Sequence, residues 1–403
     1  MRAREILLSA STLRCVRVKW QNREAYRLTN GLVELVALTG GGHLPEFRFV
    51  KGSGVSSANP LWTAPWPTID PQKYTEREHA ERYGSRGEGQ LLGGLAGHNI
   101  CLDYFGAASK EEVANGLSFH GEASNRKWIP QGIKVTRDSA ELTLSVDLPA
   151  SELRMSRRMK ILPGESVVRF TETLDNLKQA DHYYQWAEHV TLGSSFLNAK
   201  DSYTVIPAGE GTTDPNGYDE GKELLARGRK FRWPFAPAAA GGHIDLSRPF
   251  ARKGKGYVTS QLLQSTGKGD TTFIAAINAR LGLLIGYIFS RRDFPWVVLW
   301  EENAAIEAKP WNGRTQARGL EFSNTPFPNG RQAAILQGSF QGLPTLSRIP
   351  SRGQRTVSFC AFLAELPQNF GKVQSISTEP EAIRISSRRN KSFLIPSVGL
   401  GRD

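Results

Sequence analysis

LTLSVDL, residues Leu142–Leu148, alternates apolar and polar side chains without interruption. Because successive side chains of a strand point to opposite faces, this period of two is typical of a strand with one face in a core. The next two apolar segments, Met155–Leu162 and Val167–Leu174, flank the turn residues Pro163 and Gly164. We therefore predict a β-hairpin directly after the first strand.

The same pattern recurs in the second half of the chain. Phe273–Asn278, Leu283–Phe289 and Trp296–Glu301 follow one another across short turns, and Val357–Leu363 alternates again. Helical periodicity is nearly absent, and Lys73–Tyr83 is the best helical segment. Many short strands separated by glycine- and proline-containing turns are typical of sandwiches and barrels, so the sequence predicts an all-β fold.

The chain of 403 residues is long enough to bury a substantial core. We expect a single large β-sandwich domain over residues 1–385. A basic tail, residues 386–403, follows it and is expected to be partly disordered.

Two loops stand out from the strand pattern. The segment 55–71 holds Trp62 and Trp66 among four prolines and is incompatible with a central strand. Its tryptophans either pack beneath the loop or line a ligand cleft, because leaving two of them in water is costly. Thr212–Arg229 is polar and glycine-rich, and we predict a surface excursion there.

Composition limits the classes of function. The 51 basic and 39 acidic residues give a net charge of +12, but the basic residues are spread along the chain without interleaved aromatics. We therefore expect no nucleic-acid partner. No apolar run approaches eighteen residues and no signal peptide is readable, so we expect a cytoplasmic protein with no membrane association. Three widely spaced cysteines are consistent with reduced thiols.

The first candidate site segment is Gly116–Trp128, GLSFHGEASNRKW. If a strand ends at His120, Gly121 allows a sharp turn that presents the imidazole at the rim of a sheet. Trp128 adds a flat aromatic face with a polar group. These features suit a pocket for a polyhydroxylated ligand, although a histidine at a strand end is often structural.

The second segment is His182–Gly193, HYYQWAEHVTLG. As a strand it places Gln185 and His189 on one face, so His189 is a plausible acid at a pocket wall. The alternative is a structural histidine that is hydrogen-bonded to Glu188 or to the backbone.

The third segment is RGLEFSNTPF, Arg318–Phe327. Glu321 lies between Leu320 and Phe322 in an otherwise apolar strand. A carboxylate near a core is costly unless it is paired, and partial desolvation raises its pKa toward that of a useful base. The alternative is a rim-exposed glutamate on the outer face.

Together these segments resemble the aldose 1-epimerase (galactose mutarotase) family. The resemblance is carried by His120-Gly121 with Trp128, then by His189 in AEHVTLG and Glu321 in GLEFSNTPFP, and it covers most of the chain. It implies a galactose mutarotase-like β-supersandwich with a sugar site that needs no cofactor and no metal. In this family a glutamate removes the proton of the anomeric hydroxyl and a histidine protonates the ring oxygen. The resemblance therefore implies Glu321 as the base, His189 as the acid and His120 as a second polar contact.

The resemblance also suggests residues that bind the sugar. His98 and Asn99 stand where the family usually has a Gly-Arg motif, and Asp245 is the position we assign to its sugar-binding aspartate. The remaining residues expected to contact the substrate are Trp128, Gln185, Trp300 and Trp311.

We thus predict an isomerase that interconverts the α and β anomers of an aldose, with a small-molecule sugar as its partner. Which sugar it binds, and whether it is a monomer or a homodimer, remain open. One alternative is a carbohydrate-binding protein on the same scaffold without turnover. Another is a glycoside-cleaving enzyme that uses Glu321 with Glu301 or Glu302, which requires carboxyl groups about 5–9.5 Å apart.

Overall fold

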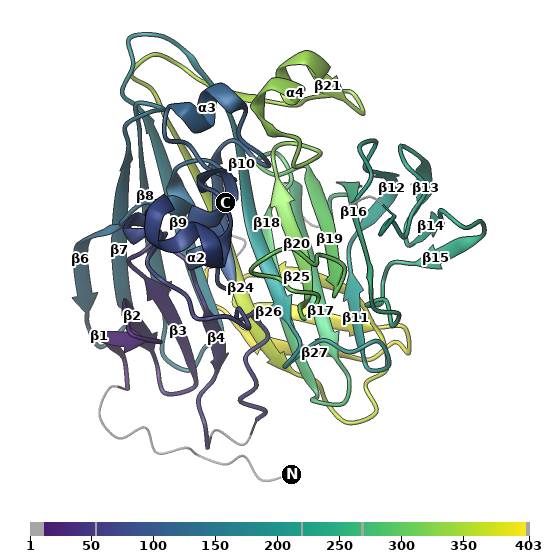
Figure 1. Cartoon of the computed structure of the whole chain (residues 1–403). Helices are drawn as coiled ribbons and strands as arrows, with labels where there is room; N and C mark the ends of the chain where they lie inside the picture. The colour runs from purple at the N-terminus through teal and green to yellow at the C-terminus, as the bar shows by residue number, and fades with distance from the viewer. Residues whose placement is uncertain (1–11, 53–54, 219–220, 267–269, 400–403) are drawn as a thin grey trace.

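The computed structural model describes residues 12–52, 55–218, 221–266 and 270–399. Two large antiparallel sheets form the framework of the structure (Figure 1), so the predicted all-β class is confirmed. In spatial order, the ten-stranded sheet contains β15 (His243–Asp245), β14 (Phe235–Pro237), β13 (Lys230–Arg232), β12 (Ala208–Thr213), β16 (Lys255–Leu263), β19 (Trp296–Asn303), β20 (Gln316–Ser323), β10 (His182–Gly193) and β23 (Ser347–Ile349), with β5 (His98–Asp103) also paired to β10.

The second large sheet has eight strands. In spatial order they are β11 (Ser202–Val205), β17 (Thr271–Asn278), β18 (Leu283–Ser290), β24 (Gln354–Glu365), β9 (Val167–Asn176), β8 (Leu153–Ile161), β7 (Ala140–Leu148) and β6 (Ile129–Val135). The predicted hairpin is β8–β9, which pairs from Leu153↔Asn176 to Ile161↔Val168. The strand pattern read from the sequence is therefore confirmed in this sheet.

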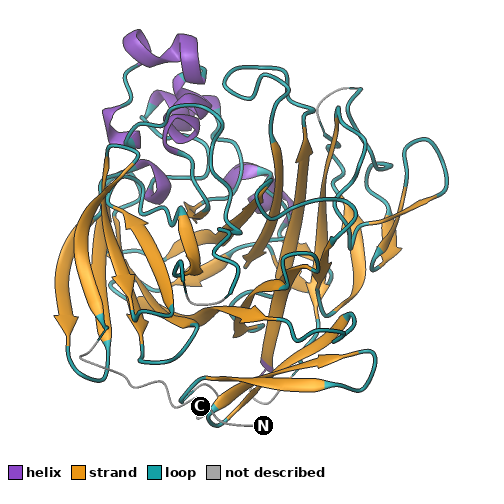
Figure 2. Ribbon diagram, turned by 90° about the horizontal axis from the view of Figure 1, so that it is seen from below, coloured by secondary structure: helices purple, strands orange, loops and turns teal. Residues whose placement is uncertain are grey.

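Smaller elements surround the two sheets. Figure 2 shows most helical segments gathered at one edge of the strands. The small sheets are β1 (Arg14–Trp20), β2 (Arg23–Thr29), β3 (Val33–Leu38) and β4 (Glu46–Phe49); β21 (Ser339–Phe340) and β22 (Leu343–Pro344); and β25 (Val373–Glu379), β26 (Ala382–Ser387) and β27 (Ser392–Pro396). The helices are α1 (Glu76–Tyr83), α2 (Arg86–Gly94), α3 (Lys110–Ala114) and α4 (Gly330–Gln337), with 3-10 turns η1 (Pro71–Lys73) and η2 (Ala123–Asn125). Over the described ranges, none of these helices has the length and apolar character needed to cross a bilayer.

The main hydrophobic core lies between the two large sheets. It joins side chains of the eight-stranded sheet, such as Leu144, to Val190 of β10 and Phe322 of β20. Because side chains alternate along a strand, the neighbours of Val190 and Phe322 point away from this core. Two of those neighbours, His189 and Glu321, are directly opposite one another in the antiparallel register. The outer face of the ten-stranded sheet therefore carries both residues.

The tryptophan-containing loop packs as part of a second core on that outer face. Trp62 and Trp66 are buried, and their rings lie 6.0 and 5.1 Å from the ring of Trp311. The helix expected over Lys73–Tyr83 is shorter in the structure. Lys73 ends the 3-10 turn η1, and the regular helix α1 begins at Glu76. Of the two alternatives for these tryptophans, packing beneath the loop is the one that the structure shows.

The described residues of the basic tail, 386–399, continue a small antiparallel sheet. Here β26 and β27 form a hairpin that pairs from Ala382↔Pro396 to Ser386↔Ser392. Ile395 packs with Ile383 and Ile385 in an apolar cluster against the eight-stranded sheet. A few alternating apolar side chains therefore anchor this basic segment.

Candidate active site

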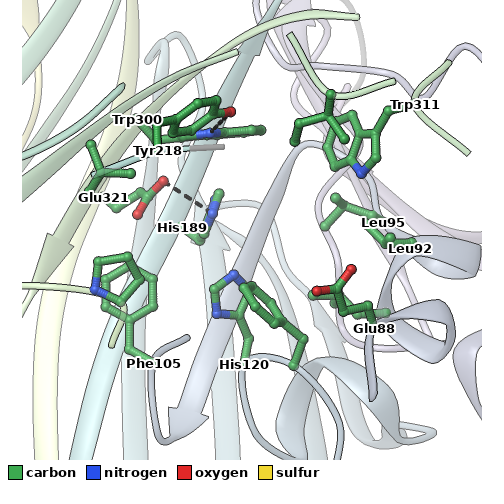
Figure 3. A pocket seen from close by; sticks show the side chains of 15 residues that line it. Glu88, Leu92, Leu95, Phe105, His120, His189, Tyr218, Trp300, Trp311 and Glu321 are labelled. Atoms are coloured by element: carbon green, nitrogen blue, oxygen red, sulfur yellow. Dashed lines mark hydrogen bonds and ion pairs between the residues drawn. The ribbon is translucent and has the colours of Figure 1, made fainter. Parts of the chain in front are cut away.

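A cavity of about 250 Å³ opens on the outer face of the ten-stranded sheet (Figure 3). Its size is close to the lower end of ligand pockets, which span roughly 300–1,000 Å³. Strands β10, β20, β19 and β16 each supply one side chain to the cavity, while α2 and the loops around it supply the opposite wall. The lining residues are Glu88, Leu91, Leu92, Leu95, Phe105, Phe119, His120, His189, Tyr218, Val258, Trp300, Ile306, Trp311, Glu321 and Pro328.

His189 and Glu321 form the polar centre of the cavity. His189 Nε2 lies 3.1 Å from Glu321 Oε1, and both side chains are buried. The other ring nitrogen, Nδ1, lies 3.0 Å from Thr191 Oγ1. Glu321 Oε1 forms no hydrogen bond of good geometry within the described chain, so the carboxyl retains acceptor capacity for a ligand.

A glycine makes room for this carboxyl. Gly319 precedes Glu321 by two residues and shares its face of β20, and a Cβ at position 319 would lie 2.1 Å from Glu321 Oε1. Gly319 also pairs with Trp300 on β19. The missing side chain therefore lets the Glu321 carboxyl lie back along its own strand.

His120 reaches the cavity from a turn, so the prediction that it ends a strand is wrong. Its φ is +67° and that of Gly121 is +79°. A Cβ at Gly121 would lie 2.2 Å from Leu102 O, which explains why glycine follows the histidine. The His120 ring lies 5.2 Å from the His189 ring. The Gly106 N–H donates to His120 Nδ1 over 3.0 Å, so the neutral ring carries its proton on Nε2.

Burial favours the uncharged forms of His189, His120 and Glu321. Desolvation lowers the pKa of His189 from 6.5 to about 3 and holds that of His120 well below 6.5, with a further contribution from nearby His189. Desolvation also raises the pKa of Glu321 well above 4.5. Both shifts favour the uncharged forms, which are a protonated Glu321 carboxyl and a neutral His189 imidazole.

One wall of the cavity is aromatic and already hydrogen-bonded. Trp300 Nε1 donates to the Tyr218 hydroxyl over 3.1 Å, and this hydroxyl lies 2.6 Å from Glu302 Oε2 and donates to it. Trp300 and Trp311, which the sequence analysis names as substrate contacts, both line the cavity. Tyr218 was missed, because it lies in the polar segment 212–229 and nothing in its local sequence distinguishes it.

The structure places two of the expected sugar contacts in the core instead. His98 Nε2 lies 2.7 Å from Glu188 Oε2, on the inner face of the ten-stranded sheet. Trp128 is fully buried and donates from Nε1 to Ala123 O over 2.8 Å. The expectations for His98 and Trp128 are therefore wrong, because strand alternation and close packing direct both side chains away from the cavity.

Three further expected contacts lie outside the cavity lining. Gln185 is on the same face as His189, but its amide binds Phe105 N–H and Thr325 Oγ1, so it positions the wall residue Phe105. Asn99 is opposite His189 in the register, beneath the lining side chains. Asp245 lies at the end of β15, far along the sheet, and accepts hydrogen bonds from the backbone N–H and the hydroxyl of Ser247. These three assignments are also corrected.

The arrangement does not support glycoside cleavage by a pair of carboxyls. Glu301 Oε2 accepts from Arg318 Nε over 2.6 Å, and Glu302 Oε1 accepts from the Ala305 N–H over 2.6 Å. Both glutamates are bound to other protein groups outside the lining, so neither of them can act as the second carboxyl beside Glu321. Among the described residues, no group of three or more His, Cys, Asp or Glu side chains could hold a metal ion.

The fold is shared with solved structures. No family model matches the sequence, and no curated protein sequence matches it significantly. A candidate aldose 1-epimerase from Klebsiella pneumoniae is similar over 85% of this chain and 79% of its own, with a TM-score of 0.63 and 12% identity. A galactose mutarotase-like protein from Clostridium acetobutylicum is similar over 88% and 99%, with a TM-score of 0.57 and 13% identity. A candidate aldose 1-epimerase from Escherichia coli is similar over 85% and 99%, with a TM-score of 0.53 and 13% identity.

These similarities define the class of fold. The chain has a galactose mutarotase-like β architecture, as its resemblance at the sequence level implied. At 12–13% identity the similarity establishes the fold alone. The activity must therefore be argued from the site.

Proposed function

We propose that this protein interconverts the α and β anomers of an aldose by acid–base ring opening and reclosure. The observation that carries this proposal is the His189–Glu321 contact of 3.1 Å on the floor of a cavity of about 250 Å³. Ring opening requires one proton to leave the anomeric hydroxyl and one to reach the ring oxygen. A buried carboxyl and imidazole that share one proton can meet both requirements.

The proton balance can be followed step by step. Transfer of the shared proton from Glu321 to His189 gives a carboxylate beside an imidazolium. The Glu321 carboxylate takes the hydroxyl proton on O1 while His189 protonates the ring oxygen, the C1–O5 bond breaks, and a C1 aldehyde forms. Rotation about C1–C2 turns the other face of the aldehyde to the ring hydroxyl, and the reverse transfers reclose the ring. The pair ends with its original single proton.

His120 adds a hydrogen-bond donor to this step. Because the Gly106 N–H occupies Nδ1, the proton on Nε2 remains for a ligand oxygen. Its lowered pKa keeps the ring neutral, so it assists as a dipole without adding charge.

Binding without turnover is the second candidate function. It is favoured by the raised pKa of Glu321, since a carboxyl that stays protonated with sugar bound is a poor base. The two functions differ in whether the proton on Glu321 moves to His189 when the sugar is bound.

The test is the equilibration of a pure α-anomer followed by polarimetry, with NMR exchange spectroscopy at equilibrium. Our proposal predicts acceleration proportional to enzyme concentration, beyond that of buffer alone. If no hexose or pentose is accelerated, the catalytic proposal fails. Binding-only function would then be supported by saturation-transfer signals from a sugar whose anomers still equilibrate at the buffer rate.

A further inference from the structure

The imidazole of His189 has a polar neighbour at each of its two nitrogen atoms. Nε2 lies 3.1 Å from Glu321 Oε1 (Figure 3), and Nδ1 lies 3.0 Å from the hydroxyl oxygen of Thr191. We propose that Thr191 is a positioning residue, whose hydroxyl oxygen accepts a hydrogen bond from Nδ1–H and so keeps Nε2 of His189 free to take the proton of Glu321. This inference rests on the proposed function, because it states how the acid–base pair is prepared for proton transfer.

Thr191 is fixed on β10 by its backbone. Its N–H donates to Gly97 O over 3.2 Å, and its carbonyl accepts from the Trp62 N–H over 2.8 Å. The residue is buried, and it lies on the same face of the strand as His189, two residues away. Because a β-branched side chain has a restricted χ1 angle, its hydroxyl oxygen is held beside Nδ1.

The neighbours of the His189 ring favour a proton on Nδ1. In a neutral imidazole one nitrogen carries the proton and the other accepts, so the hydrogen-bond partner of one nitrogen decides the role of the other. Desolvation lowers the pKa of His189, and a hydrogen bond between the ring and its own backbone opposes this shift. Such a bond raises the pKa of a histidine only if the ring donates. Since Nδ1 is the nitrogen nearer the main chain, this backbone acceptor and the Thr191 oxygen are both on its side of the ring.

The carboxyl on the other side of the ring requires an acceptor. Burial favours the protonated form of Glu321, whose O–H is a donor. Nε2 of His189 lies 3.1 Å from Oε1, and this oxygen has no other hydrogen-bond partner in the described chain. With its proton on Nε2 instead, the ring would present an N–H to Oε1, and the carboxyl O–H would lose this acceptor. The tautomer with Nδ1–H therefore suits both neighbours of the ring.

The second imidazole of the cavity has the opposite tautomer. The Gly106 N–H donates to Nδ1 of His120 over 3.0 Å, which leaves the proton of this ring on Nε2. The two rings lie 5.2 Å apart. His120 therefore offers the cavity a donor and His189 an acceptor, so His189 is the ring that is prepared to take the proton of Glu321.

NMR of the unmodified protein without a sugar tests the tautomers directly. Long-range proton–nitrogen correlation spectra of protein labelled with heavy nitrogen in its histidines distinguish a protonated ring nitrogen from an unprotonated one. At neutral pH we expect His189 to be protonated at Nδ1 and His120 to be protonated at Nε2. His189→Gln and His120→Gln assign the signals, because each removes one set. A protonated Nε2 in His189 would overturn the inference.

Substitution of Thr191 tests whether its hydroxyl keeps this tautomer. Thr191→Val retains the shape but removes the acceptor, so the spectrum should show a mixture of His189 tautomers. We expect kcat to fall by about tenfold, with KM changed by less than about twofold. Thr191→Ser should restore the single tautomer and most of kcat, and the control Thr143→Val, at a half-buried position of β7, should change neither. An unchanged His189 spectrum in folded Thr191→Val would overturn the inference.

The outcomes separate this inference from the proposed function. Acceleration of a sugar together with a protonated Nε2 in His189 overturns the role of Thr191 and leaves the isomerase proposal standing. If no sugar is accelerated, the isomerase proposal fails, and the spectra still decide the role of Thr191. A protonated Nδ1 that is lost in Thr191→Val and restored in Thr191→Ser would then support it, and an unchanged spectrum would overturn it.

Discussion

His189 and Glu321 are directly opposite one another on β10 and β20, and their Nε2 and Oε1 atoms lie 3.1 Å apart. Backbone pairing therefore fixes the distance between the proposed acid and base. A slip of one residue would turn one of the two side chains into the core between the sheets. The register of two central strands thus determines the chemistry of the cavity.

Gly319→Ala should impair activity more than stability. A Cβ here would meet Glu321 Oε1, the far end of a flexible side chain, so the carboxyl can move aside at little cost to the fold. A displacement of about 1 Å can reduce a rate by about 10²-fold, and we expect a loss of that order in kcat/KM.

Gly132→Ala is the matched control for this substitution. Its added Cβ would meet no atom of the described chain within 4 Å, so activity should persist. Full activity in Gly319→Ala would show that the position of Glu321 is not critical.

The pH dependence should reflect the single shared proton. Because burial lowers the pKa of His189 from 6.5 to about 3, the pair gains a second proton only near that pH. It loses its proton only above the raised pKa of Glu321. We expect kcat/KM, corrected for buffer catalysis, to show no loss as the pH falls from about 6.5 to about 5, because His189 stays neutral over this range. An acid limb with a midpoint near pH 6.5 would indicate a solvated histidine and contradict this account.

Trp311→Ala should destabilise the protein by about 3–5 kcal/mol, because a large buried side chain is removed. Trp311 joins the loop residues Trp62 and Trp66 to Trp300 on the sheet. Denaturant unfolding measures the loss, and Ile335→Ala on the exposed face of α4 should change stability by less than about 0.5 kcal/mol. A loss below about 1 kcal/mol would mean that this aromatic cluster contributes little to packing.

His98→Ala should reduce stability by about 1–3 kcal/mol, because it leaves the buried Glu188 carboxyl without one of its partners. The kcat/KM of the folded protein should be unchanged, since His98 lies on the core side of the sheet. The exposed His243→Ala is the control, with no expected change in either quantity. A loss of activity at constant stability would indicate that His98 contributes to the sugar site, and would contradict this prediction.

The sequence was sufficient for what depends on local periodicity. Alternation identified β7 and the β8–β9 hairpin, and an unbroken strand over His182–Gly193 placed His189 on a defined face. Glu321 was recognisable because a carboxyl between two apolar core residues needs a reason to be there.

Features that depend on contacts between residues far apart in the sequence could not be predicted. His98 and Asn99 are adjacent, and only the pairing of β5 with β10 decides which of them faces the core. Trp128 is directed by its contact with Ala123, and Tyr218 enters the cavity through the fold of a long loop. Local composition predicts neither the path of a loop nor the register between two strands.

The most direct test of the central claim compares Glu321→Gln with the unmodified protein in the equilibration of a pure anomer of an accepted sugar. The amide keeps the shape of the side chain but removes the proton exchange with His189, so we expect kcat to fall by about 10²–10⁴-fold. Glu365→Gln, at an exposed position of β24, should retain full activity. Acceleration by Glu321→Gln equal to that of the unmodified protein would contradict the assignment of Glu321 as the base.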